Sequence, residues 1–422
     1  MLRALRSRNY RLFVAGQGVS LIGTWMQQVA MGWLVYRLTG SAMMLGLLGF
    51  TSQIPILLIA PLAGVLADRW DRRRILMATQ TLALLQATIL SAIVLTDIVQ
   101  TWHLIALSLL MGVANGFDIP VRQSFVVEMV EQREDLGNAI ALNSAMFNSA
   151  RLIGPAIAGL LLSAFGEGVC FLINSLSYLA IIAALATMRI TPNGKPQQRK
   201  HLVHELREGV SYAFGFGPIR CILILVILMS LLGMPYTVLM PLFADQVFRG
   251  GAHTYGFFLS AAGAGALCGT LFLAARRNVL GLSGTIVRST AIFGCGIATF
   301  ALSRSLYVAI PALVLAGFGA TSMFASCNTI IQTIVEEDKR GRVMSLYAMS
   351  FGGMLPFGNL IAGFLASRLG AREAVLLGGF CSLAGAAFFA WKLPGFKMVV
   401  RPIYRRMGIL PEAAERVTTA DE

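Results

Sequence analysis

Three ionisable side chains stand inside long apolar stretches of this sequence, where a charge is costly unless it is paired or hydrated. Asp118 and Arg122 are four residues apart, so on a helix they share one face. Arg151 lies near the middle of the next apolar stretch. A carboxylate that gains and loses a cationic partner between two conformations can carry a proton. We therefore expect a pair or a triad among these residues, a charge cluster in which Asp118 either titrates or belongs to a permanent structural ion pair.

The apolar stretches themselves predict a polytopic membrane protein. Hydrophobic residues make up 56% of the 422 residues and charged residues 13%, whereas soluble domains have roughly 45–50% and about 25%. Each stretch has about 20 residues, the length of helix that crosses a bilayer. We predict an all-α fold with twelve membrane-spanning helices. They lie near residues 13–36, 43–67, 75–96, 103–127, 138–162, 169–188, 219–243, 254–275, 285–302, 307–333, 343–367 and 371–391.

Basic residues are distributed unevenly among the connections between these spans. Few Lys and Arg residues follow the odd-numbered spans, and most lie before the first span, after the even-numbered spans and after the last one. The net charge of +14 would suggest nucleic acid as a partner of a soluble protein, but one-sided placement is typical of cytoplasmic loops. We expect a multi-pass protein of the inner (plasma) membrane with both termini in the cytoplasm, and no nucleic-acid partner.

A long polar connection divides the chain into two halves. It contains Pro192, Gly194 and Pro196, followed by apolar residues whose helical spacing predicts a short amphipathic helix on the cytoplasmic face. The segment 158–161 resembles the segment 362–365, as expected for two pseudo-symmetric six-helix halves that arose by duplication. The predicted divisions are 1–188 for the first half, 189–218 for the linker, 219–391 for the second half and 392–422 for a cytoplasmic tail.

The connection after the second span combines a glycine, an aspartate and arginines at fixed spacing. It resembles the signature loop of the major facilitator superfamily, Gly-x-x-x-Asp-Arg/Lys-x-Gly-Arg/Lys-Arg/Lys. The matching residues are Gly64, Asp68, Arg69, Arg72 and Arg73, whereas Asp71 stands where the second glycine is usual. The resemblance implies that Asp68 caps the start of the eleventh span across the interface of the halves, where helix N–H groups favour a carboxylate. It also implies that the arginines bond neighbouring helices and hold a cytoplasmic gate shut.

The fifth span carries a second pattern, in which Gly154, Pro155 and Gly159 resemble the Gly-Pro motif of antiporters in the same superfamily. Small residues at this spacing permit close helix packing, and a proline removes one backbone hydrogen bond. The first forty residues, including the segments 9–13 and 20–26, resemble the branch that contains enterobactin exporters and macrolide efflux pumps. This resemblance implies export, although packing alone explains small residues in a span.

Polar side chains within several spans are candidates for a substrate cavity between the halves. Gln17, Thr24 and Gln28 recur at helical spacing and share one face of the first span. The residues that we place at such a cavity are Gln17, Thr24, Gln28, Asn143, Asn328 and Gln332. Such residues either contact substrate or form hydrogen bonds between helices.

Enzyme and metal sites have no support in the sequence. None of the four histidines belongs to an HExxH pair, and no glycine-rich phosphate loop is followed by a lysine. The six cysteines are scattered singly, without the spacing of a metal site. We therefore expect neither catalysis nor a cofactor nor a bound metal.

The residues and the resemblance together predict a secondary active transporter. We expect a monomeric, proton-coupled exporter of a bulky or amphipathic small molecule, siderophore-like or drug-like, that works by alternating access in the lipid bilayer. Its partners would be the substrate and protons. The alternatives are a uniporter or importer, a lysophospholipid or lipid flippase, and a membrane sensor that transports nothing.

Overall fold

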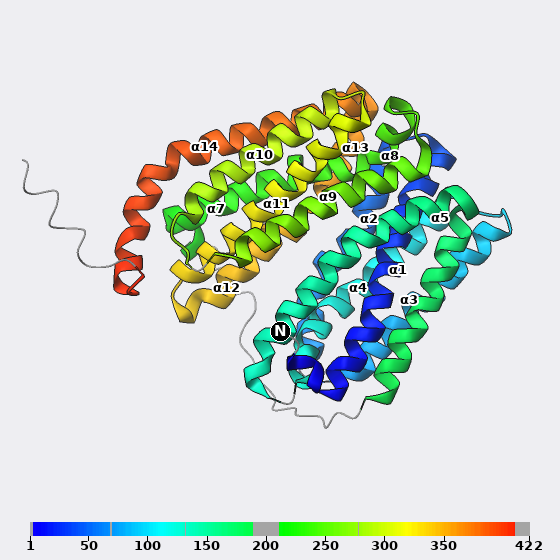
Figure 1. The fold of residues 1–422 in the computed structure, drawn as a ribbon, viewed down its shortest axis with the longest axis horizontal. Coiled ribbons are helices and arrows are strands. Elements are labelled where there is room, and N and C mark those ends of the chain that lie inside the picture. Colours follow the sequence, from blue (N-terminus) through cyan, green and yellow to red (C-terminus); the bar gives the residue numbers. More distant parts are fainter. Residues whose placement is uncertain (1–2, 68–69, 131, 189–210, 277, 410–422) are drawn as a thin grey trace, which may run out of the picture.

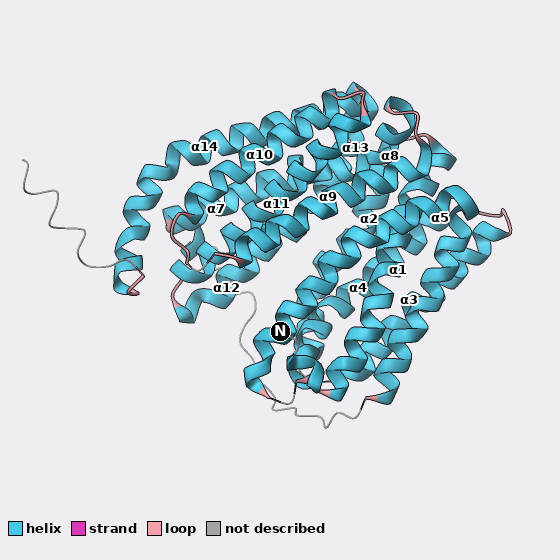
Figure 2. Ribbon diagram, in the orientation of Figure 1, coloured by secondary structure: helices cyan, strands magenta, loops and turns pink. Residues whose placement is uncertain are grey.

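The computed structural model describes residues 3–67, 70–130, 132–188, 211–276 and 278–409, which form helices joined by short turns (Figure 2). Ten helical segments of this part of the chain are long and apolar enough to cross a membrane. The helices form two bundles that lie side by side, one from the first half of the chain and one from the second (Figure 1). The predicted fold class, an all-α polytopic membrane protein in two halves, is confirmed.

The first half is built from five long helices. These are α1 (Arg8–Thr39), α2 (Ala42–Ala67), α3 (Arg72–Leu95), α4 (Thr101–Met129) and α5 (Leu136–Thr187), with short 3-10 turns at Arg3–Arg6 and Arg133–Asp135. The chain changes direction inside α5 at Gly166, where φ is 77° and ψ is −179°. Glycine adopts this conformation readily because it has no Cβ. α5 therefore contains both the fifth and the sixth predicted spans.

Two spans of the second half are interrupted. One runs through α7 (Gly217–Leu228), η3 (Met229–Gly233), η4 (Met234–Leu239), α8 (Met240–Leu242) and η5 (Phe243–Val247), and the other through α12 (Glu337–Ala348), η6 (Met349–Gly353) and α13 (Leu355–Leu369). Irregular backbone at membrane depth is tolerated where protein buries it or where it lines a cavity. Both interrupted spans pack on the first half. The regular helices are α9 (Gly251–Ala274), α10 (Leu282–Leu302), α11 (Leu306–Ile334) and α14 (Ala371–Arg406).

The last helix does not end at residue 391, where the sequence predicted the end of the final span. α14 continues to Arg406. Phe396, Val400 and Tyr404 follow one another at four-residue spacing, and all three are buried in the hydrophobic core of the second half. Residues four apart lie on one face of a helix, so these three side chains form an apolar face that packs on the second half. Most of the described part of the predicted tail is therefore helical.

Successive helices run in opposite directions, so their connections alternate between the two ends of the bundles. We name the end that contains the N-terminal turn and the start of α3 the basic side, and the end where α1 stops at Thr39 the opposite side. The two halves meet near the opposite side and are separate at the basic side (Figure 1). The predicted linker helix falls mostly on residues 189–210, outside the described residues.

Two glycine contacts bring the halves together near the opposite side. Gly363 of α13 faces Gly46 of α2, and a Cβ on Gly363 would lie 2.8 Å from the Gly46 Cα. Gly256 of α9 faces Gly159 of α5, and a Cβ on Gly256 would lie 2.7 Å from the Gly159 Cα. Small residues allow helix backbones to approach this closely. The contacts of α2 with α13 and of α5 with α9 are the extensive ones between the halves.

Candidate functional site

A cavity of about 340 Å³ lies between the two halves. Its walls come from all five helices of the first half and from η4, α9 and α13 of the second half. Thr24 and Gln28, two of the predicted cavity residues, line it. Asn115 and Asn359 also line it, although the sequence did not single them out. An apolar stretch gives no signal for which of its faces meets the other half.

The other predicted cavity residues lie elsewhere. Gln17 lines a second, smaller cavity of about 40 Å³ within the first half. Gln332 donates its side-chain amide to the side-chain oxygen of Asn328, one turn earlier on α11. Asn143 is partly buried on α5. Asn143, Asn328 and Gln332 are therefore outside the walls of the central cavity in this conformation.

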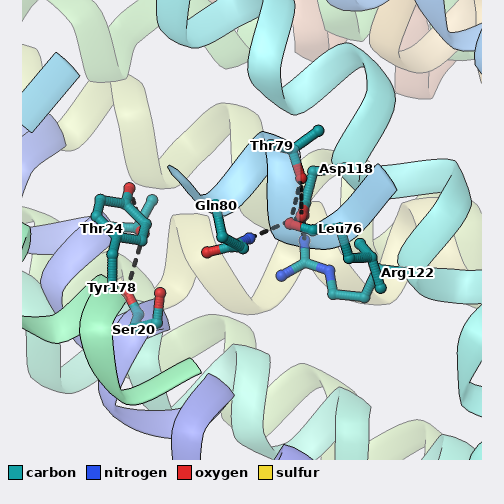
Figure 3. A network of polar contacts seen from close by, with 8 residues as sticks. All are labelled: Ser20, Thr24, Leu76, Thr79, Gln80, Asp118, Arg122 and Tyr178. Atoms are coloured by element: carbon teal, nitrogen blue, oxygen red, sulfur yellow. Dashed lines mark hydrogen bonds and ion pairs between the residues drawn. The ribbon is translucent and has the colours of Figure 1, made fainter. Parts of the chain in front are cut away.

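Asp118 and Arg122 form the predicted ion pair, with Arg122 Nη2 lying 3.2 Å from Asp118 Oδ2. Two side chains of α3 complete the network. Gln80 Nε2 donates to Asp118 Oδ1 at 2.7 Å, and the Thr79 hydroxyl shares its proton between the same oxygen at 3.2 Å and the Leu76 carbonyl oxygen at 3.0 Å. Figure 3 shows these three donors around the carboxylate. The carboxylate is buried, with 6% of the Asp118 side chain exposed. Every contact in this network is made within the first half.

The ion pair lies beside the central cavity. Asp118 and Arg122 line the smaller cavity, and Thr24, Met111 and Asn115 line both cavities. The Thr24 hydroxyl is also 3.3 Å from the hydroxyl of Tyr178 (Figure 3), a residue that lines the smaller cavity. A common wall of three residues thus separates the buried carboxylate from the space between the halves.

Arg151 does not join Asp118 and Arg122, so of the expected pair or triad this structure contains the pair. Its guanidinium lies over the ring of Trp25, with Cζ 5.9 Å from the ring centroid, and the residue lines the central cavity. Asp118 and Arg151 each lie near the middle of an apolar stretch, which predicts similar depth in the membrane. α5, which carries Arg151, makes few contacts with α4, which carries Asp118 and packs mainly on α2 and α3. Equal depth therefore does not bring Asp118 and Arg151 together.

The glycine-proline pattern of α5 lies where α1, α5 and α9 meet. A Cβ on Gly154 would lie 2.6 Å from the Trp25 Cβ of α1. Gly159 contacts α9 as described above, and Pro155 lines the central cavity. This segment thus forms part of the cavity wall and part of the contact between the halves.

The signature loop is only partly described, because Asp68 and Arg69 lie outside the described residues and Gly64 belongs to the last turns of α2. Arg72 Nη1 lies 2.5 Å from Glu128 Oε1 of α4. Arg73 donates through Nη2 to the carbonyl oxygen of Ala186, at 2.7 Å, near the end of α5. These two arginines bond neighbouring helices of the first half.

Asp71, which departs from the usual pattern of this loop, caps the start of α3. Its side chain accepts hydrogen bonds from the backbone N–H of Arg73 at 2.9 Å and of Arg74 at 3.4 Å. Aspartate directly before the first helical residue is a common N-cap. An aspartate shortly before an apolar run is a signal for a helix start that was present in the sequence.

Side chains close the opposite side between the halves. The Tyr36 hydroxyl of α1 donates to Asp245 Oδ2 of η5 at 2.6 Å. The rings of Trp33 and Tyr255 stack with centroids 6.4 Å apart. At the basic side, α12 packs on α7, α11 and η6, all within the second half, and its N-cap residue Glu336 makes no side-chain cap bond. The contacts described between the halves therefore run from the cavity to the opposite side.

Comparison with known proteins extends over nearly the whole chain. The model of the family described as transmembrane secretion effector (MFS_3) matches residues 2–406. The staphyloferrin A transporter of Staphylococcus aureus (strain NCTC 8325 / PS 47) is 24% identical over 361 residues, which cover 85% of this chain and 90% of that protein. Macrolide efflux protein A of Streptococcus pyogenes is 22% identical over 369 residues, 86% of this chain and 91% of that protein. Among solved structures, the nucleoside transporter NupG has a TM-score of 0.73 at 12% identity, covering 92% of this chain and 99% of that chain.

Proposed function

Because the chain belongs to the transmembrane secretion effector family of the major facilitator superfamily, we propose that it exports a bulky or amphipathic small molecule in exchange for protons. Family and relatives make it a multi-pass membrane transporter. Export, the chemical class of the cargo and proton coupling are the proposed parts. The observation that carries them is a buried carboxylate ion pair that shares a wall with a cavity between two halves.

The basic side faces the cytoplasm in this proposal, and the membrane is the plasma (inner) membrane. Arginines gather at this side, among them Arg3, Arg8, Arg72, Arg73 and Arg74. Cytoplasmic connections of membrane proteins carry such an excess of basic residues. The contacts on the opposite side then exclude the external solution, and the cavity takes its cargo from the cytoplasm.

Alternating access requires the contacts on the opposite side to break and new ones to form on the basic side. The bond between Tyr36 and Asp245 would break, and α2 would separate from α13. The signature loop would then contact the start of α12, where Asp68 would cap helix N–H groups that the side chain of Glu336 does not cap. Substrate and protons would shift the balance between the two states through their different affinities for each.

Proton exchange at Asp118 would couple to this movement. Protonation of Asp118 would remove its negative charge and so weaken its ion pair with Arg122. It would also weaken the hydrogen bonds by which Thr79 and Gln80 join α3 to α4. The shared wall of Thr24, Met111 and Asn115 gives cargo in the central cavity a route to disturb the same network. Protonation of Asp118 and binding of cargo in the central cavity would thereby influence each other.

The test is uptake into everted membrane vesicles with an imposed pH gradient, acid inside, followed for a panel of siderophores, macrolides and dyes. We expect gradient-driven uptake of at least one compound, and loss of that uptake in Asp118→Asn, which keeps the side-chain size and removes the titrating group. Asp97→Asn, an exposed aspartate in the turn between α3 and α4, is the matched control and should transport normally. Uptake that ignores the gradient would favour a uniporter, and unchanged uptake in Asp118→Asn would reject this coupling site.

A further inference from the structure

Arg151 is the only formally charged residue among the described residues that line the central cavity. Its position is fixed from two sides. The guanidinium lies over Trp25 of α1, and the Arg151 carbonyl oxygen lies against Gly263 of α9, where an added Cβ would be 2.9 Å away. The Arg151 charge thus lies where α5 contacts α1 of the first half and α9 of the second. The Arg151 side chain is exposed only in part.

The carboxylates of the neighbouring spans are engaged elsewhere. Asp118 pairs with Arg122, Glu128 with Arg72, and Glu167 with Arg37 at 2.8 Å, whereas Asp245 accepts the hydrogen bond from Tyr36. Within the described part of the chain, Arg151 makes no ion pair with any carboxylate. A cation in a span is costly without a partner, and the aromatic face of Trp25 compensates only a part of that cost.

The rest of the wall suits a molecule that is partly polar and partly aromatic or apolar. The side-chain amides of Gln28, Gln53 and Asn115 line the cavity and make no hydrogen bond to another described residue. By contrast, Gln27 is held by Gln86 and Asn174, at 2.9 and 2.7 Å. Aromatic and apolar side chains complete the wall, namely Trp25, Tyr255, Met234 and Leu259. A volume of about 340 Å³ suits a small organic molecule.

We propose that the central cavity binds an amphipathic organic anion, whose carboxylate, sulfonate or similar acidic group pairs with Arg151. This inference rests on the proposed transport function and names its substrate class. The ligand supplies the counter-charge that the described residues lack, while its rings contact Trp25 and Tyr255 and its polar groups bond the free amides. An organic cation is disfavoured, because it would meet Arg151 and no carboxylate of the cavity wall.

The test compares two dyes that share one ring system, the net anionic sulforhodamine B and the cationic rhodamine 6G. Their affinities for the purified full-length protein in detergent are measured by fluorescence polarisation, without any gradient. We expect the wild type to bind the anion at least tenfold more tightly. Arg151→Met should weaken binding of the anion about 30-fold or more, which is roughly 2 kcal/mol at 1.4 kcal/mol for each factor of ten, the low end for removing one partner of a buried charge pair.

Two variants control for charge and for fold. Arg151→Lys keeps the charge and should bind the anion within about tenfold of wild type, and Arg288→Gln removes an exposed arginine of α10 and should change nothing. If Arg151→Met does not fold, the dye preference of the wild type and of Arg151→Lys still decides the matter. A wild type that binds the cation as well as the anion, or binds no anion, overturns the proposal.

Failure of this inference is distinguishable from failure of the proposed function. Gradient-driven transport of cations that does not depend on Arg151 would overturn the substrate class and leave proton-coupled export standing. Anion binding that depends on Arg151, without flux into vesicles, would overturn export and leave a ligand site in the cavity.

Discussion

Replacing Tyr36 with phenylalanine removes one hydrogen bond between the two halves and leaves the aromatic ring in place. The hydroxyl of Tyr36 donates to the carboxylate of Asp245 at 2.6 Å. A hydrogen bond to a charged group contributes about 1.5–3 kcal/mol. Tyr36 is buried but Asp245 is exposed, so water competes for the carboxylate and the lower end applies. At about 1.4 kcal/mol for each factor of ten, the balance should shift roughly tenfold away from the state closed on the opposite side.

The assay is the distance distribution between spin labels on Leu38 and Arg304, exposed residues of the two halves on the opposite side. The labels are attached to introduced cysteines after the six native cysteines have been replaced. We expect the population with long distances to grow about tenfold in Tyr36→Phe. The control is Tyr307→Phe, because the Tyr307 side chain is 92% exposed and its hydroxyl should bond only water. Identical distributions in the wild type and Tyr36→Phe would refute the role assigned to this bond.

Three further variants test other parts of the structure. Asp71→Ala should lower the free energy of unfolding by about 0.5–1 kcal/mol through loss of the cap of α3, while Asp71→Asn should retain most of it, as judged by thermal unfolding in detergent. Gly256→Ala puts a Cβ 2.6 Å from a backbone oxygen of α5, so it should lengthen the distances on the opposite side and slow transport, whereas Gly284→Ala, with open space around it, should do neither. Arg72→Gln leaves Glu128 partly buried without this partner and should cost about 1–3 kcal/mol, less when combined with Glu128→Gln, in a double-mutant cycle of unfolding.

Features that depend on one helix were accessible from the sequence. The apolar stretches gave the helices, and the four-residue spacing of Asp118 and Arg122 gave an ion pair that the structure contains. The end of α14 was not predicted, because the uniformly apolar span ends near residue 391 whereas Phe396, Val400 and Tyr404 form a narrow apolar face of a helix that continues past it.

Features that depend on two helices were less accessible, because periodicity reports the faces of a helix and not its neighbours. Arg151 was therefore grouped with Asp118, although it belongs to the central cavity. The bond between Tyr36 and Asp245 joins residues far apart in the chain, each unremarkable in its own stretch. No spacing rule in a single sequence connects them.

Proton movement driven by cargo is the direct test of coupled export through Asp118. Purified protein is reconstituted in liposomes with the pH dye pyranine trapped inside, and a gradient of sulforhodamine B is imposed across the membrane without a pH gradient. We expect wild-type protein to move protons opposite to the flow of the dye, and Asp118→Asn to move none. Dye flow without proton movement in the wild type, or equal proton movement in Asp118→Asn, would contradict it.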